Sequence, residues 1–169
     1  DAVRVLNSNF QKYKGKITVL TTGGGVLADE LANFAEAEGN GWIEFHGRVS
    51  KQEYEQLLKM SNVGLCLKLP STEMGAVTFP SKVIELAAQG KLVLTTKLGQ
   101  VADLLGADGA RYLEGEDPFA LAQAMVDIVT DRESSMRVAN VGQQRVLSRC
   151  SPEKVSDDIC HLFAEKMSG

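Results

Sequence analysis

The chain has 169 residues, of which 44% are hydrophobic and 24% charged, and its net charge is −4. These values suit one globular domain with a sizeable buried core, and they argue against a nucleic-acid-binding surface, which needs clustered Lys and Arg. Apolar runs are strand-length, well below the roughly 20 residues that a membrane helix needs. Three cysteines without a C-x-x-C pair predict neither a disulfide framework nor a zinc site. We therefore expect a reduced, cytoplasmic protein.

The first part of the chain alternates helices with short apolar strands. Helical spacing of Val3, Leu6 and Phe10 predicts a helix over residues 2–10. In chain order we then expect a buried strand at 16–21, a helix with Leu27, Leu31 and Phe34 on one face, a strand at 42–45, a helix opened by the capping box Ser50–Glu53, and a strand at 63–67.

The second part continues the alternation and ends in helices. The expected elements are a loop at 68–79, a helix at 81–89, a strand at 92–95, a short helix at 101–105, a strand at 111–114, a helix opened by Asp117–Pro118, and a last helix opened by Ser151–Pro152 with Val155, Ile159, Leu162 and Phe163 on one side. Such alternation predicts an α/β protein with a three-layer, Rossmann-like and mostly parallel sheet.

Three segments follow predicted strands, where open parallel sheets bind their ligands. They are Thr21–Gly25, His46–Val49 and Thr78–Glu85. Glycines after a strand let the backbone approach a phosphate closely, and Gly23, Gly25 and Ala28 match the pattern G-x-G-x-x-A. A tight turn between strand and helix explains the same glycines. An NAD site also needs an acidic residue that closes the next strand, whereas Glu44 is expected in mid-strand, which weakens that interpretation.

The segment at Pro80 carries a more specific pattern. Pro80 pre-sets the first turn of a helix, and Ser81 and Lys82 follow at its start. A lysine is unfavourable near the positive end of a helix dipole, which suggests that an anion offsets it. Glu85 comes three residues after Lys82 and shares its side of the helix. The cation and the carboxylate suit a diphosphate joined to a ribose; the alternative is a surface ion pair on an ordinary helix.

Taken together, these segments resemble the C-terminal domain of retaining GT-B glycosyltransferases. The resemblance runs in order through residues 17–24, 43–50 and 54–67, and most specifically through residues 79–94, FPSKVIELAAQGKLVL, which are similar to the family pattern P-S-K-x-x-E-x-x-A-x-G. The resemblance implies a nucleotide-diphosphate-sugar donor. It implies that Glu85 binds the ribose hydroxyls, that Ser81, Lys82 and amides after Pro80 face the diphosphate, that Gly47, Arg48 and Val49 border the base through main-chain atoms, and that Gly23, Gly24 and Gly25 keep the cleft floor open.

The chain departs from the family pattern in two places. The first Glu of the motif E-x7-E falls at Val77, and Glu73 does not replace it, so the residue facing the sugar and the catalytic residues stay unassigned. Family members also begin this domain with a strand and a basic loop, and carry an N-terminal acceptor domain. We therefore expect residues 1–169 to be a single nucleotide-sugar-binding domain and a fragment that lacks the first strand and the acceptor domain.

The resulting hypothesis is a glycosyltransferase domain of polysaccharide or glycolipid synthesis. It implies transfer to an acceptor hydroxyl without a resident cofactor or metal, with the missing acceptor domain as partner and peripheral membrane association through a lipid-linked acceptor. Two alternatives stay open. One is a Rossmann-like oxidoreductase domain that binds NAD through Gly23 to Ala28, and the other is a non-catalytic α/β module that senses nucleotides or binds a partner.

Overall fold

The computed structural model describes residues 1–68, 81–97, 99–156 and 160. The chain forms two compact units, each assembled from two stretches of sequence. Unit 1 comprises Asp1–Asn62 and Glu116–Arg132, and unit 2 comprises Val63–Gly115 and Glu133–Gly169. Each unit is described by itself below. The expectation of one domain over 1–169 stays a prediction.

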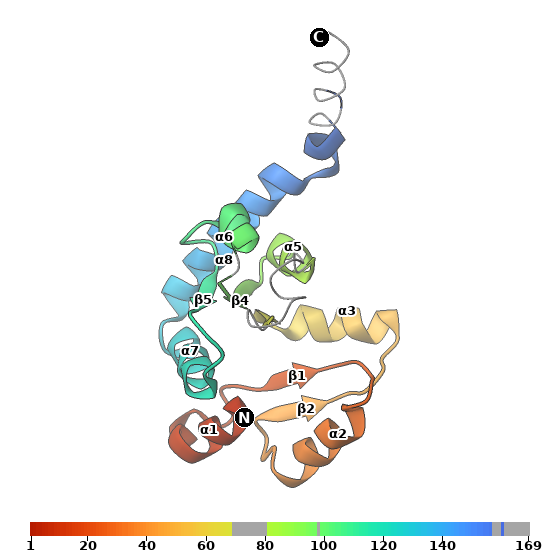
Figure 1. Ribbon diagram of the computed structural model, residues 1–169, viewed down its shortest axis with the longest axis vertical. Coiled ribbons are helices and arrows are strands. Elements are labelled where there is room, and N and C mark those ends of the chain that lie inside the picture. The colour runs from red at the N-terminus through yellow and green to blue at the C-terminus, as the bar shows by residue number, and fades with distance from the viewer. Residues whose placement is uncertain (69–80, 98, 157–159, 161–169) are drawn as a thin grey trace. The chain divides into compact units, whose positions relative to one another are not determined.

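Unit 1 is built on a pair of parallel strands, β1 (Val19–Thr21) and β2 (Ile43–Phe45), in which Val19 lies opposite Ile43 and Thr21 opposite Phe45 (Figure 1). The helices of the unit are α1 (Ala2–Asn9), the 3₁₀ turn η1 (Gln11–Tyr13), α2 (Ala28–Ala37), α3 (Lys51–Met60) and α7 (Pro118–Thr130). Helix α7 is far from α1 in sequence but packs against it. The Phe10 and Phe119 rings lie 5.8 Å apart, and Thr130 Oγ1 donates to Tyr13 Oη at 3.2 Å.

Unit 2 holds a three-stranded parallel sheet in the order β3–β4–β5. The strands are β3 (Val63–Cys66), β4 (Leu92–Thr96) and β5 (Arg111–Leu113), and the helices are α5 (Lys82–Ala88), α6 (Gly99–Leu105) and α8 (Arg132–Cys150). Every residue of the central strand β4 is buried, which explains its unbroken apolar and β-branched sequence. Gly64 leaves room for Leu86, so α5 packs directly onto β3.

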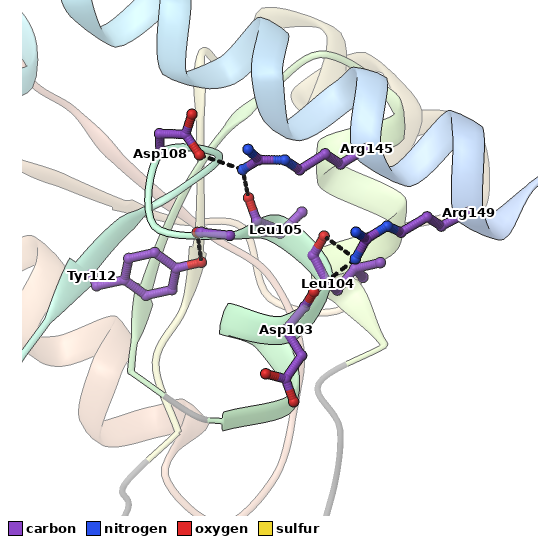
Figure 2. Close-up of polar contacts among 8 residues, drawn as sticks. Asp103, Leu104, Leu105, Asp108, Tyr112, Arg145 and Arg149 are labelled. Atoms are coloured by element: carbon purple, nitrogen blue, oxygen red, sulfur yellow. Dashed lines mark hydrogen bonds and ion pairs between the residues drawn. The ribbon is translucent and has the colours of Figure 1, made fainter.

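Two arginines of α8 bind the carboxyl end of α6 (Figure 2). Arg145 donates to the Leu105 carbonyl and to the Asp108 carboxylate, and Arg149 donates to the Asp103 carbonyl at 2.7 Å. The last carbonyls of a helix have no partner within it and form its negative end, so cationic donors stabilise it there. Arg145 also lowers the pKa of Asp108 through its hydrogen bond to the carboxylate.

The predicted fold class is confirmed, since the strand pairs in the described residues are all parallel and helices separate these strands in sequence. The cap predictions are confirmed as well. Ser50 and Glu53 form the reciprocal capping box, and Asp117 accepts from the Phe119 amide at 3.0 Å. Ser151 Oγ accepts from the Lys154 amide at 3.2 Å, and residues 152–156 are helical. The expectations for Ile159, Leu162, Phe163 and most of the loop at 68–79 fall outside the described residues.

Two expectations for unit 1 are wrong. The strand predicted as buried over 16–21 covers only Val19–Thr21, and its residues are half-buried. Leu27 is not on the inner face of the following helix: it is 67% exposed and precedes α2, which begins at Ala28. Leu27 is instead the N-cap residue of α2, with a φ of −99° and a ψ of 5°, so its side chain precedes the first turn of the helix.

Candidate functional site

The first two candidate segments meet at the carboxyl ends of β1 and β2. The His46 amide donates to the Thr21 carbonyl at 2.9 Å, and the Gly23 amide donates to the Gly47 carbonyl at 2.7 Å, so the pairing of the strands continues into both loops. Gly47 has a φ of 63°, in the left-handed region that favours glycine. The structure therefore brings Gly23–Gly25 and Gly47–Val49 together, although more than 20 residues separate them in sequence.

The middle glycine of the run has a different role from its neighbours. Gly24 does not have a positive φ, but a Cβ atom built there would lie only 2.6 Å from Arg48 Nε. The Arg48 side chain thus occupies the space that a residue other than glycine would fill. Arg48 is exposed and forms no hydrogen bond or ion pair with another described residue. Its guanidinium is available to a ligand.

The third candidate segment lies in unit 2, where Ser81 and Lys82 open α5. Pro80 is outside the described residues. Lys82 Nζ and Glu85 Oε2 form an ion pair at 2.5 Å, with Lys82 exposed and Glu85 half-buried. Lys82 and Glu85 lie on one side of the helix, as predicted. They also form the surface ion pair that was the alternative interpretation. The Ser81 side chain makes no capping hydrogen bond.

Cys66 shows where this ion pair lies relative to the sheet. It is the last residue of β3 and is buried. Burial raises the pKa of the Cys66 thiol to about 11, while the nearby Lys82 charge lowers it and the nearby Glu85 charge raises it. Both charges therefore act on the carboxyl end of β3, the edge at which parallel sheets bind their ligands.

The Cys66 thiol should resist alkylation in the folded protein. At pH 8 a thiol with a pKa of about 11 is almost wholly protonated, and only the thiolate reacts fast. We expect Cys160, which is exposed, to react first with iodoacetamide, and Cys66 to react only in denaturant. Peptide mapping by mass spectrometry checks the order. Labelling of native Cys66 as fast as Cys160 would contradict this burial.

Two hydrogen bonds at the ends of the unit 2 strands were not predicted from the sequence. Thr95 Oγ1 donates to the Cys66 carbonyl at 2.9 Å, and Thr96 Oγ1 donates to the Lys68 carbonyl at 2.7 Å. The two hydroxyls anchor the chain leaving β3 against β4. Their only signal in the sequence is a pair of threonines at the end of an apolar strand, which β propensity explains equally well.

The described residues do not support an NAD site, a metal site or a membrane-spanning helix. Glu44 lies in the middle of β2, as predicted, and its carboxylate is 3.4 Å from His46 Nε2 instead of closing the strand as in an NAD site. Within residues 1–68, 81–97, 99–156 and 160, no three His, Cys, Asp or Glu side chains converge as a metal site. In that same part of the chain, no helix combines the length and apolarity that crossing a bilayer requires.

The family model "Glycosyl transferases group 1" matches residues 1–131. The chain belongs to this glycosyltransferase family. The matched stretch includes every predicted donor-binding residue, from Gly23 to Glu85. Among curated proteins, a sequence search gives no significant match.

Solved structures share the fold at low sequence identity. A glycosyltransferase from Rickettsia africae superposes with a TM-score of 0.72 at 18% identity, covering 97% of this chain and 44% of that one. The Anabaena protein HepE in complex with UDP gives 0.71 at 14%, covering 89% and 41%. The C-terminal domain of a group 1 family protein from Francisella tularensis gives 0.66 at 15%, covering 89% and 76%.

These similarities identify the fold of this family member. It is the Rossmann-like α/β fold of the C-terminal half of a GT-B glycosyltransferase, as the sequence predicted. The chain spans 41% of the length of HepE and 44% of the Rickettsia glycosyltransferase.

Proposed function

We propose that this chain is the part of a glycosyltransferase that binds a nucleotide-diphosphate sugar for transfer to an acceptor hydroxyl with retention of configuration. The observation that carries the proposal is the family match over residues 1–131, which includes the predicted donor-binding loops. The joined loops after β1 and β2, and the Lys82–Glu85 pair beside the carboxyl end of β3, support it. The proposed setting is polysaccharide or glycolipid synthesis in the cytoplasm.

The chemistry that these residues offer is binding and charge stabilisation. Glu85 would accept hydrogen bonds from the ribose hydroxyls, and Lys82 with the Ser81 region would face the diphosphate. Negative charge grows on the departing diphosphate, and fixed donors placed there lower the barrier without a resident cofactor or an obligatory metal. A further N-terminal domain of the same enzyme would bind the acceptor. A lipid-linked acceptor would bring the full enzyme to a membrane surface.

For the base, UDP is the first nucleotide to test, because HepE has been crystallised with UDP. We expect UDP or GDP to bind at least about tenfold more tightly than NAD in isothermal titration calorimetry, a difference of about 1.4 kcal/mol. The reason is that Glu44 is not placed at the end of its strand, where a carboxylate would bind the ribose of NAD.

The same titrations separate the competing functions. NAD binding that is tighter than UDP and GDP binding, and unchanged in Glu85→Ala, would favour a Rossmann-like oxidoreductase domain. An absence of any nucleotide binding would favour a non-catalytic module. A matched variant is Glu44→Ala, which removes an exposed carboxylate from β2 and should leave UDP binding unchanged.

A further inference from the structure

We propose that the Arg48 guanidinium, held over Gly24, is the diphosphate-binding cation of unit 1, and that Gly24 is the positioning residue that gives it room. The identity of the ligand rests on the function proposed above. The sequence resemblance implied only main-chain contacts to the base for Arg48, so a phosphate role for its side chain is a separate assignment.

The local charges favour Arg48 as the source of positive charge in this loop. Helix α2 begins just after the glycine run, but its first turn carries Asp29 and Glu30, which offset the positive end of its dipole. Neither carboxylate pairs with Arg48. An anion at the glycine run would thus find its positive charge in the Arg48 guanidinium rather than at the start of α2.

The backbone beside Arg48 offers further donors. The amides of Gly24 and Gly25 donate to no group in the described part of the chain, whereas the Gly23 amide is used by the Gly47 carbonyl. Without Cβ atoms, Gly24 and Gly25 let an oxygen approach these amides closely. Successive free amides form an anion-binding concavity, and a planar guanidinium can donate two parallel hydrogen bonds to a phosphate. This combination suits a diphosphate better than an uncharged ring.

The three glycines predict two different mutational outcomes. Gly23 and Gly25 need glycine because of their φ angles, so side chains there strain the backbone. Gly24 has no such strain, and the three atoms nearest to an added Cβ, at 2.6, 3.1 and 3.3 Å, all belong to the flexible Arg48 side chain. Gly24→Ala should therefore fold normally and displace Arg48.

A double-mutant cycle tests the assignment. UDP, uridine and inorganic pyrophosphate are titrated into the wild type, Arg48→Ala, Gly24→Ala and the double variant. We expect each single variant to weaken UDP and pyrophosphate binding about tenfold, as for the loss of a charge-assisted hydrogen bond. Uridine binding and the melting temperature should not change, and the double variant should be no weaker than Arg48→Ala. Arg132→Ala, which removes another exposed arginine of unit 1, is the matched control.

Each other outcome overturns a defined part of the assignment. Equal losses for uridine and UDP would mean that Arg48 contacts the base. Additive effects of the two substitutions would mean that Gly24 does not act through Arg48. If wild-type protein fails to bind pyrophosphate, the anion site is wrong. UDP binding that depends on Glu85 but not on Arg48 would remove this inference and leave the proposed function standing. Pyrophosphate binding that depends on Arg48, with UDP binding no tighter than pyrophosphate binding, would support the anion site at Arg48 and contradict the proposed function.

Discussion

Replacing Glu85 with glutamine should weaken UDP binding by about tenfold or more. The substitution keeps the size of the side chain but removes the charge that would accept hydrogen bonds from both ribose hydroxyls. A hydrogen bond to a charged group contributes about 1.5–3 kcal/mol, which corresponds to roughly 10- to 150-fold in Kd. The melting temperature should change little, because a partly exposed ion pair such as Lys82–Glu85 contributes only about 0–1 kcal/mol to stability.

Two comparisons make this result specific to the ribose. Glu114→Gln removes an exposed carboxylate of unit 2 that pairs with Lys97 at 3.1 Å, and it should not change UDP binding. The 2′-deoxy analogue of UDP should bind the wild type more weakly than UDP does, and Glu85→Gln should lose less affinity for the analogue than for UDP. Equal losses for both nucleotides would show that Glu85 does not contact the 2′-hydroxyl.

Gly142→Ala should destabilise the protein, although alanine is the better helix former. Gly142 lies inside α8, and an added Cβ would overlap the Gly109 carbonyl oxygen, which belongs to the backbone and cannot rotate away. Such overpacking typically costs about 1–3 kcal/mol, more than the roughly 1 kcal/mol that alanine gains over glycine in a helix. We expect a lower midpoint in urea, measured by circular dichroism.

The control for this prediction is Asn140→Ala, on the exposed side of the same helix. Alanine there should be neutral or slightly stabilising, since only helix propensity changes. If Gly142→Ala raised the midpoint as Asn140→Ala does, the close packing of α8 on the segment at Gly109 would be refuted.

Local signals in the sequence predicted most of the elements correctly. The capping box at Ser50 and the Asp117–Pro118 start are each made within four residues, so no distant contact is needed to form them. The apolar run that begins at Leu92 predicted a strand at 92–95, and the structure has the strand β4 at Leu92–Thr96 with every residue buried. The order of these elements was sufficient to predict an α/β fold.

Contacts between distant residues decided the rest. The sequence shows three adjacent glycines. It does not show that Gly23 and Gly25 have positive φ angles that favour glycine, or that Gly24 makes space for Arg48. Nor does it show that two arginines of α8 bind the end of α6.

From its sequence alone this protein is an α/β member of a glycosyltransferase family with a charged pair after Pro80, because strand periodicity, caps and the P-S-K-x-x-E pattern are local. Only the tertiary structure decided which loops meet, which glycine is needed for space and which arginine fills that space. These properties depend on atoms that folding brings together from positions more than 20 residues apart, which no local pattern encodes.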